Sequence, residues 1–392
     1  MKCSFVSGIL LLTIAVVLTI DQVQSQRVLV CYYSSWAYYR PSKGQFGVDK
    51  IDPNLCTHVV YAFVGANSDA TVRVMDPWLE LEENWGLGLF RQFNELKLKN
   101  PSLKTLVAIG GWNEGSEIFS NLVGDSSMRA SFVNNLYNFV KNYGFDGLDL
   151  DWEYPAQRGG RPEDKQNFVY WIRELRSKFA PEGLLLTAAV HAAISSVGTS
   201  YDIQELANNL DYINMMSYDY HGSWEQITGI NSPLYPSFVD TDYTLNINAS
   251  IQYWLNNGCP STKLLLGIPT FGRTYTLSNP NSPGLGAQAY GPGLPGPYSQ
   301  ESGFLGYNEI CELQWPGLWS INWAAQQKVP FAFKGSLWVG YENMDSVKIK
   351  ADYVKQYNLG GALVWGLETD DFDNVCREGK NPLITTIKNN IN

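Results

Sequence analysis

The sequence predicts an α/β fold, and within that class a (β/α)8 TIM barrel that carries a small α+β insertion. Short apolar runs alternate with stretches of helical period, there are eight such runs, and one long Gly- and Pro-rich segment interrupts the alternation. The candidate strands are residues 28–33, 57–63, 104–110, 145–153, 184–190, 212–216, 264–269 and 361–365.

The helical periodicity between the strands indicates the α/β alternation more strongly than the short apolar runs do. Phe132, Leu136, Val140 and Tyr143 recur at helical spacing, and Gly144 follows as a C-cap just before the next strand. Parallel strands joined by amphipathic helices define an α/β protein. An open, doubly wound sheet is the alternative as long as no motif is considered.

The interruption covers about residues 274–335, between the seventh strand and the seventh helix. Such a length is far beyond a normal loop, so we expect an inserted α+β subdomain on the C-terminal face of the barrel. Gly291 to Gly296 matches G-x-G-x-x-G, but two prolines interrupt the match and no helix follows. This segment is therefore not a phosphate-binding loop.

Residues 1–25 are typical of a secretory signal peptide. Lys2 supplies the positive start, residues 8–20 form an apolar run that is short for a membrane span, and Val23-Gln24-Ser25 offers a cleavage site. An uncleaved anchor is the alternative. We expect a secreted, extracellular chain in which residues 26–392 form one catalytic barrel without an appended binding module.

Composition restricts the ligands. The net charge is −10 and basic runs are lacking, which argues against nucleic acid and anionic membranes as partners. Aromatic residues make up 14% of the chain, an excess that a sugar-stacking cleft would use. We expect a monomer that binds a neutral ligand and needs neither a metal nor a cofactor.

The cysteines fit an oxidising compartment. Outside the signal peptide the chain has Cys31, Cys56, Cys259, Cys311 and Cys376, which can form at most two disulfides whose pairing the sequence leaves open. Asn248-Ala-Ser250 is a glycosylation sequon that a secreted chain could use.

The run Phe145-Asp-Gly-Leu-Asp-Leu-Asp-Trp-Glu153 carries the chemistry. In a strand, side chains alternate between faces, so Asp149, Asp151 and Glu153 point into the barrel, roughly 6–7 Å apart along the strand. Asp146 has the opposite parity and should have its own partner at the strand entrance. Buried carboxylates this close cannot all ionise, so the row should hold a proton. Glu153 lies nearest the C-terminal mouth, where barrel active sites form, and is the candidate general acid.

This run closely resembles the signature of glycoside hydrolase family 18, which contains animal chitinases and chitinase-like lectins. The resemblance extends from about Val28 to the C-terminus. Further matching stretches are Cys31-Tyr-Tyr-Ser-Ser-Trp36, Tyr61-Ala-Phe63, Gly110-Gly-Trp-Asn113, Met216-Ser-Tyr-Asp219, His221-Gly-Ser-Trp224, Phe271-Gly-Arg273 and Leu363-Val-Trp365.

The resemblance implies an endo-type chitinase that cleaves β-1,4 links between N-acetylglucosamine units with retention. In this family the acetamido oxygen of the substrate replaces the second carboxylate. Glu153 would be the acid and base, Asp151 would orient the acetamido group, and Asp149 would share a proton or hydrogen bond with Asp151. Tyr218 would donate to the acetamido oxygen, and Asp219 would position the sugar.

The resemblance also implies substrate contacts and disulfides. The implied substrate-binding residues are Tyr32, Trp36, Phe63, Trp112, Asn113, Met216, Asp219, Trp224, Arg273 and Trp365, with Tyr32 among the aromatics that would stack on sugars. The implied disulfides are Cys31–Cys56 and Cys311–Cys376, which leaves Cys259 free and buried. Phe271 and Ala108 depart from the Tyr and Ser of many relatives, and we expect these changes to alter affinity, not chemistry.

Other functions compete with this interpretation. A catalytically silent chitin lectin of the same family is the chief rival, but such relatives lose the last Glu or the middle Asp, and both are present here. An enzyme that releases N-glycans shares the carboxylate strand. A metal-dependent hydrolase is disfavoured because the three histidines form no His-Glu-x-x-His pair, and a serine hydrolase because the Gly-x-Ser-x-Gly elbow is missing.

Overall fold

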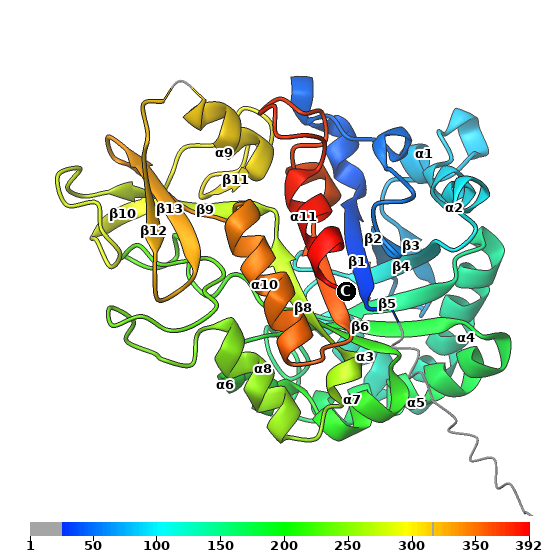
Figure 1. Ribbon diagram of the computed structural model, residues 1–392. Helices are drawn as coiled ribbons and strands as arrows, with labels where there is room; N and C mark the ends of the chain where they lie inside the picture. Colours follow the sequence, from blue (N-terminus) through cyan, green and yellow to red (C-terminus); the bar gives the residue numbers. More distant parts are fainter. Residues whose placement is uncertain (1–25, 316) are drawn as a thin grey trace, which may run out of the picture.

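A computed structural model describes residues 26–315 and 317–392 (Figure 1); the predicted signal peptide lies outside the described residues. Eight parallel strands form a closed barrel. They are β1 (Val28–Ser34), β2 (His58–Ala66), β4 (Lys104–Gly110), β5 (Gly147–Asp151), β6 (Leu185–His191), β7 (Tyr212–Met216), β8 (Leu264–Pro269) and β15 (Gly361–Trp365).

The barrel closes through β1, which pairs with the second strand and with the last. Val30 lies opposite His58 on β2, and Val28 lies opposite Gly361 on β15. The order around the ring is β1-β15-β8-β7-β6-β5-β4-β2, and the short strand β3 (Val72–Val74) adds antiparallel to β2. The closed ring confirms the predicted barrel and excludes the open sheet.

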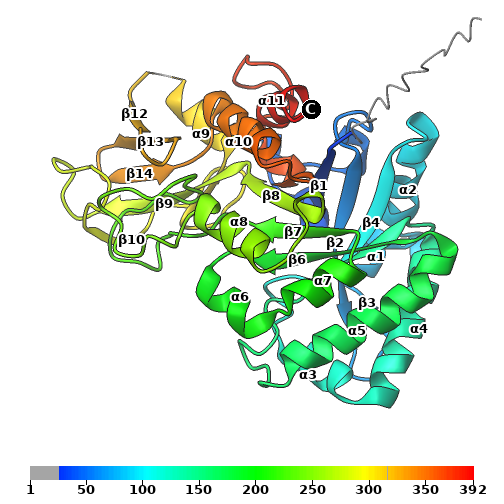
Figure 2. The same ribbon diagram turned by 60° about the horizontal axis from the view of Figure 1, so that its bottom comes forward.

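Helices cover the outside of the barrel (Figure 2). They are α1 (Pro77–Glu80), α2 (Leu89–Lys99), α3 (Glu117–Gly124), α4 (Ser126–Tyr143), α5 (Asp164–Phe179), α6 (Ile194–Ser200), α7 (Ile203–Asn209), α8 (Ile247–Asn256), α10 (Met344–Gln356) and α11 (Pro382–Asn390). The Asp125 side chain caps α4 by accepting from the amides of Ser127 and Met128. Gly144 ends α4 with φ of 75°, as its predicted C-cap role requires.

Apolar side chains pack in two layers. One layer fills the barrel interior with every second residue of the strands, including Val28, Val30 and Tyr32 of β1. The alternate residues of the same strand, Leu29 and Tyr33, belong to the larger layer between strands and helices. This alternation follows from the period of a strand and determines which side chains face the site.

The insertion is a six-stranded antiparallel sheet with one helix, α9 (Tyr307–Gln314), and lies beside the barrel (Figure 1). Its strands are β9 (Phe271–Leu277), β10 (Ala289–Pro292), β11 (Phe304–Gly306), β12 (Ser320–Ala324), β13 (Val329–Lys334) and β14 (Leu337–Gly340). The insertion extends beyond the expected residues 274–335 at both ends. Its strand β9 starts directly after β8, and Arg273 of β9 pairs with Gly340 of β14.

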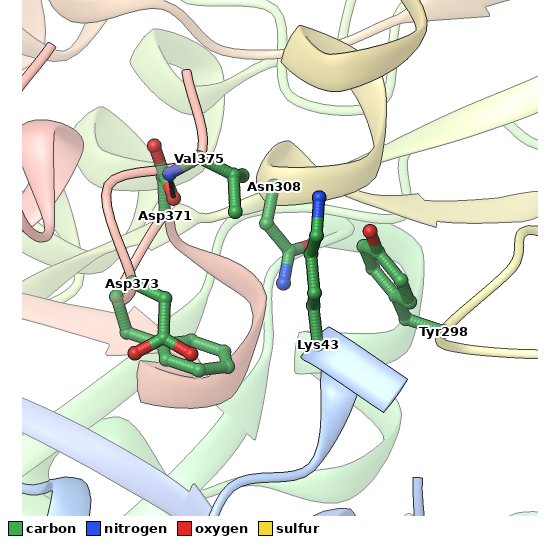
Figure 3. A pocket seen from close by; sticks show the side chains of 7 residues that line it. Lys43, Tyr298, Asn308, Asp371, Asp373 and Val375 are labelled. Atoms are coloured by element: carbon green, nitrogen blue, oxygen red, sulfur yellow. Dashed lines mark hydrogen bonds between the residues drawn. The ribbon is translucent and has the colours of Figure 1, made fainter. Parts of the chain in front are cut away.

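Both implied disulfides are present. Cys31–Cys56 connects β1 to the segment before β2, and Cys311–Cys376 connects α9 to the segment after β15. Figure 3 shows a small pocket at this second joint, where Lys43, Tyr298 and Asp371 come from three distant parts of the chain. The Asp371 carboxylate accepts from the amides of Val375 and Cys376 at 2.8 and 2.9 Å, so its oxygens brace the joint.

Two further sequence features have defined places. Cys259 is free and buried, and burial raises the pKa of its thiol to about 12, which makes it unreactive near neutral pH. Asn248 is half-buried in the first turn of α8 and accepts from the Tyr353 hydroxyl at 2.9 Å, and its glycosylation stays a prediction. Within the described residues, no helix combines the length and apolarity needed to cross a bilayer.

A buried ion pair joins the insertion to the barrel. Lys350 on α10 and Glu342, just after β14, pair with side chains 0% and 2% exposed. The Lys350 ammonium also donates to the carbonyl and hydroxyl of Ser232, at 2.7 and 2.9 Å. The Ser232 hydroxyl donates in turn to the carbonyl of Ser217, at 2.7 Å. One buried cation therefore holds the backbone just beyond β7.

We expect Lys350→Met to lower the free energy of unfolding by about 3–5 kcal/mol, because it leaves the Glu342 charge buried without its partner. Denaturant unfolding followed by tryptophan fluorescence measures this change. The double variant Lys350→Met/Glu342→Leu should recover much of the loss. Lys348→Met breaks only an exposed pair with Asp352 and should cost less than about 1 kcal/mol. A double variant no more stable than Lys350→Met would contradict this account.

Candidate active site

The carboxylate row lies on the inner face of β5 as its parity predicts. Asp149 and Asp151 point into the barrel and are 0% and 3% exposed, while Leu148 and Leu150 pack outward against the helices. Asp146 has the predicted separate partner, because Lys97 pairs with it at 3.1 Å at the strand entrance.

The strand itself is shorter than expected and ends at Asp151, not at Glu153. Gly110 and Asp151 form the last pair between β4 and β5. The amide of Gly111 donates to the Asp151 carbonyl at 2.8 Å, and β5 ends there. A Cβ on Gly110 would lie 2.1 Å from that carbonyl, so only glycine allows the approach. Glu153 therefore stands in the first turn beyond the strand, still only 8% exposed.

Three strands supply donors to Asp149. It accepts from the hydroxyls of Tyr32 on β1 at 2.8 Å and Thr187 on β6 at 2.5 Å, and from the amide nitrogen of Asn214 on β7 at 3.0 Å. The structure gives no hydrogen bond between Asp149 and Asp151 among the described contacts, and the expected sharing of a proton or hydrogen bond between them stays a prediction.

Asp151 is buried with an open acceptor. Its Oδ1 atom has no hydrogen-bond partner within the described residues. Burial, followed by the charges of Glu153 and Asp149, raises the pKa of Asp151 well above its usual value. A buried oxygen in this state is prepared to accept a hydrogen bond from a ligand N–H.

Glu153 is poised as a proton donor. Burial raises its pKa to about 7, with Asp219 adding to the rise and with Tyr154 and Arg158 opposing it. The pKa of Asp149 is also raised by burial, against its three hydrogen bonds. A carboxyl group that still holds its proton near neutral pH at a barrel mouth fits general-acid chemistry.

Arg158 ties the acid to a neighbouring loop. Its guanidinium donates to the carbonyl of Glu153 at 2.8 Å and to the carbonyl of Trp112 at 2.9 Å. The same group lies 3.5 Å over the Trp112 ring, whose side chain is 58% exposed. One cation thus orients the acid and an exposed aromatic ring.

Tyr218, Asp219 and Arg273 line the side of the mouth toward the insertion. Burial, then the charge of Asp151, raises the pKa of Tyr218 well above its usual value, so its hydroxyl stays protonated and able to donate. Asp219, with φ of 58°, makes a two-pronged ion pair with Arg273 at 2.7 and 2.8 Å. Arg273 also lies over the rings of Phe271 and Trp224, at 5.2 and 5.5 Å.

Aromatic rings form the floor of the mouth. Trp365, the last residue of β15, lies 5.8 Å from Phe63 and 6.2 Å from Trp36, and Trp36 and Phe63 stack at 6.0 Å. Trp36 is 45% exposed and Trp224 is 60% exposed, as residues that stack on sugars must be.

One of the aromatic assignments is wrong. Tyr32 is 2% exposed and its hydroxyl is engaged by Asp149 and Asn214, so its ring cannot stack on a sugar. Cys31 and Tyr33 on either side of it face the helices, so the Tyr32 side chain points into the barrel. There it supports the carboxylate of Asp149. Asn113 is exposed in the loop after β4, and Met216 is half-buried at the end of β7, so both stay predicted substrate contacts.

Sequence reasoning missed Thr187, Asn214 and Arg158. Asn214 and Thr187 are polar residues inside otherwise apolar strands, with inward parity, which is a signal that a strand-by-strand reading could have used. The contact of Arg158 with Trp112 joins two loops far apart in sequence, so no local pattern indicates it.

A closed barrel with buried, proton-holding carboxylates at the mouth of β5 and aromatic rings around them defines a glycoside hydrolase type of site. Comparison with known proteins gives the particular family. The model of glycosyl hydrolases family 18 matches residues 28–370, and the chain belongs to this family.

Proteins similar to this chain include a chitinase and a pseudo-chitinase. Chitotriosidase-1 of Mus musculus is 42% identical over 96% of this chain and 81% of its own length. The Ostrinia furnacalis Group IV chitinase, solved with allosamidin, superposes with a TM-score of 0.90 at 43% identity, over 93% of this chain and 98% of that one. Human YKL-39, a pseudo-chitinase with retained chitooligosaccharide binding, gives 0.86 at 37% identity, over 93% of this chain and 100% of that one.

We expect Arg158→Gln to raise the pKa of Glu153, because it removes a nearby positive charge that favours the carboxylate. A titration of carboxyl-labelled protein by 13C NMR, with the Glu153 signal assigned through Glu153→Gln, measures the shift. Other titratable groups that interact with Glu153 are Asp151, Asp219, Tyr154, Tyr201 and Tyr218, and all are unchanged in the variant.

Arg161→Gln is the matched control, since Arg161 lies in the same loop but binds Ser120 and makes no contact with Glu153. Arg161→Gln should leave the pKa of Glu153 unchanged. A Glu153 pKa that falls, or stays in place, in Arg158→Gln would contradict the assignment.

Proposed function

We propose that this protein is a secreted chitinase that hydrolyses β-1,4 links between N-acetylglucosamine units by a retaining, substrate-assisted mechanism. The observation that carries the proposal is the complete, buried row of Asp149, Asp151 and Glu153 beside Tyr218. Support also comes from relatives that are chitinases, at 42–43% identity.

The first step breaks the glycosidic bond. Glu153 gives its proton to the leaving oxygen, while the acetamido oxygen of the sugar bonds to the anomeric carbon and forms a cationic oxazolinium ring. The open oxygen of Asp151 accepts from the acetamido N–H and stabilises the cation. The Tyr218 hydroxyl donates to the acetamido oxygen and holds it at the anomeric carbon.

The second step restores the enzyme. The Glu153 carboxylate takes a proton from water, the water oxygen bonds to the anomeric carbon, and the bond to the acetamido oxygen breaks. Two displacements leave the configuration unchanged. Trp365, Trp36 and Phe63 support the sugars, and the two hydrogen bonds from Arg273 hold Asp219 in place.

The second candidate function is a chitin-binding lectin, which the likeness to YKL-39 favours. The two functions share the cleft and differ in the proton transfer. The presence of every group that the transfer needs supports the enzyme.

We expect Glu153→Gln to lower kcat on N-acetylglucosamine hexamer by at least about 10²–10⁴-fold, since it removes the proton donor. Binding of the hexamer by calorimetry should persist, because the amide keeps the shape of the side chain. Glu163→Gln, which changes an exposed Glu in the loop that follows, should behave as wild type. A wild-type protein that binds the hexamer without cleaving it would establish the lectin instead.

We expect fully deacetylated hexamer to be inert at concentrations where the acetylated hexamer is cleaved, because the nucleophile is the acetamido oxygen. Product analysis by mass spectrometry measures both reactions under identical conditions. Equal cleavage of the two hexamers would rule out substrate assistance, and inhibition by a chelator would instead indicate a metal-dependent reaction.

A further inference from the structure

His191 is a polar residue at the mouth of the barrel that the proposed catalytic steps do not use. It is the last residue of β6, and Thr187 of the same strand donates to Asp149 in the barrel interior. Side chains of a strand alternate between its two faces, so His191 has the same inward parity as Thr187. Ala188 and Val190, which have the opposite parity, pack against the helices. The His191 side chain therefore points into the mouth.

The register of the sheet brings His191 to the level of Glu153. Asp149 lies opposite Thr187 in the pairing of β5 with β6, so the position four residues further along each chain sets Glu153 beside His191. Although β5 ends before that level, the chain beyond it stays close, because the rings of Tyr154 and His191 lie 4.5 Å apart. His191 is thus a neighbour of the candidate acid, on the next strand of the ring.

A hydrogen bond fixes which nitrogen of the His191 ring carries the proton. The amide of Ala193 donates to Nδ1 at 2.9 Å, so Nδ1 is an acceptor and the proton of the neutral ring lies on Nε2. Burial lowers the pKa of His191 to about 4, against the opposing effect of the Asp219 charge. The ring is therefore neutral above about pH 5 and presents an uncharged N–H donor.

The Nε2 atom of His191 is open to a ligand. Within the described residues it makes no hydrogen bond, and it is not among the unpartnered side-chain atoms that are sealed from solvent. The side chain is half-buried, and on β7 its neighbour in the sheet is Met216, a predicted substrate contact. A donor in this position is satisfied by water in the free protein and by an oxygen atom of a bound ligand.

The surroundings of His191 indicate which sugar this donor reaches. In the proposed mechanism, Asp151 and Trp365 hold the sugar whose anomeric carbon is attacked, and Trp365 lies on β15, three strands away from β6. Glu153 protonates the oxygen that joins this sugar to the leaving one, so the leaving sugar begins next to Glu153. His191 stands level with this acid, and its donor therefore faces the leaving side.

We infer that His191 is a specificity-determining residue whose Nε2–H donates to an oxygen of the leaving N-acetylglucosamine unit. The inference rests on the proposed function and deepens it, because it gives the leaving side of the cleft a recognition group. A leaving sugar offers hydroxyl and acetamido oxygens to this donor. A flat aryl leaving group offers neither, so the contact favours glycan substrates over aryl glycosides.

Two substitutions separate the donor from the rest of the ring. His191→Asn keeps an acceptor for the amide of Ala193 but has no donor at the Nε2 position, whereas His191→Gln places an amide N–H near that position. The readout is the ratio of kcat/KM on N-acetylglucosamine hexamer to kcat/KM on a chitobiose with a fluorescent aryl leaving group. Loss of one hydrogen bond should lower this ratio by about three- to tenfold in His191→Asn. His191→Gln should recover most of it.

His58→Asn is the matched control. His58 is the first residue of β2, at the end of the barrel away from the mouth, and burial lowers its pKa to about 4 as well. The control should leave the ratio unchanged, and thermal melts confirm that each variant folds. A wild-type ratio in His191→Asn, an equal fall in His58→Asn, or a ratio in His191→Gln no higher than in His191→Asn overturns the contact and leaves the chitinase proposal standing.

A wild type that cleaves neither substrate refutes the proposed chitinase, and calorimetry then still decides the contact. The hexamer should bind to His191→Asn about three- to tenfold more weakly than to the wild type, because the same hydrogen bond is lost. Equal affinity of the two proteins for the hexamer would overturn the assignment of His191.

Discussion

Burial of acidic groups at the mouth of β5 is the constraint on which the rest of this structure depends. Taking a carboxylate out of water costs several kcal/mol unless donors replace the lost hydration. Asp149 obtains its donors from β1, β6 and β7, so only a closed barrel can supply them. The donors hold Asp149. Burial raises the pKa of Asp151 next to it, and the charges of Glu153 and Asp149 add to this rise. Protonation at the site is thus a property of the whole ring of strands.

Much of this arrangement could be predicted from the chain. The strand period placed Asp149 and Asp151 inside the barrel and Asp146 apart from them, and helical spacing predicted α4 up to its glycine cap. The family resemblance implied Glu153 as the acid, which stays a proposal, and it implied the two disulfides that the structure contains. These features are local in sequence or repeat with a period, which is why a pattern can carry them.

The remainder depends on contacts between distant segments. Tyr32 was assigned to the substrate because it is aromatic and near a strand end, but its role follows from the partners that lie across the barrel. Arg158 acts on Glu153 and Trp112 together, and nothing in the loop sequence indicates that a second loop lies beside it. The early end of β5 also involves a contact between distant segments, because the amide of Gly111, in the loop after β4, donates to the Asp151 carbonyl.

The buried ion pair of Lys350 and Glu342 makes the insertion a structural part of the barrel. Glu342 follows the last strand of the insertion, Lys350 belongs to a barrel helix, and through Ser232 the pair supports the carbonyl next to Tyr218. A barrel that lost Glu342 together with the insertion would keep the buried ammonium of Lys350 on α10 without a counter-charge. A shortened barrel therefore has to retain Glu342 beyond the cut, or replace Lys350 as well, if it is to fold without a buried unpaired charge.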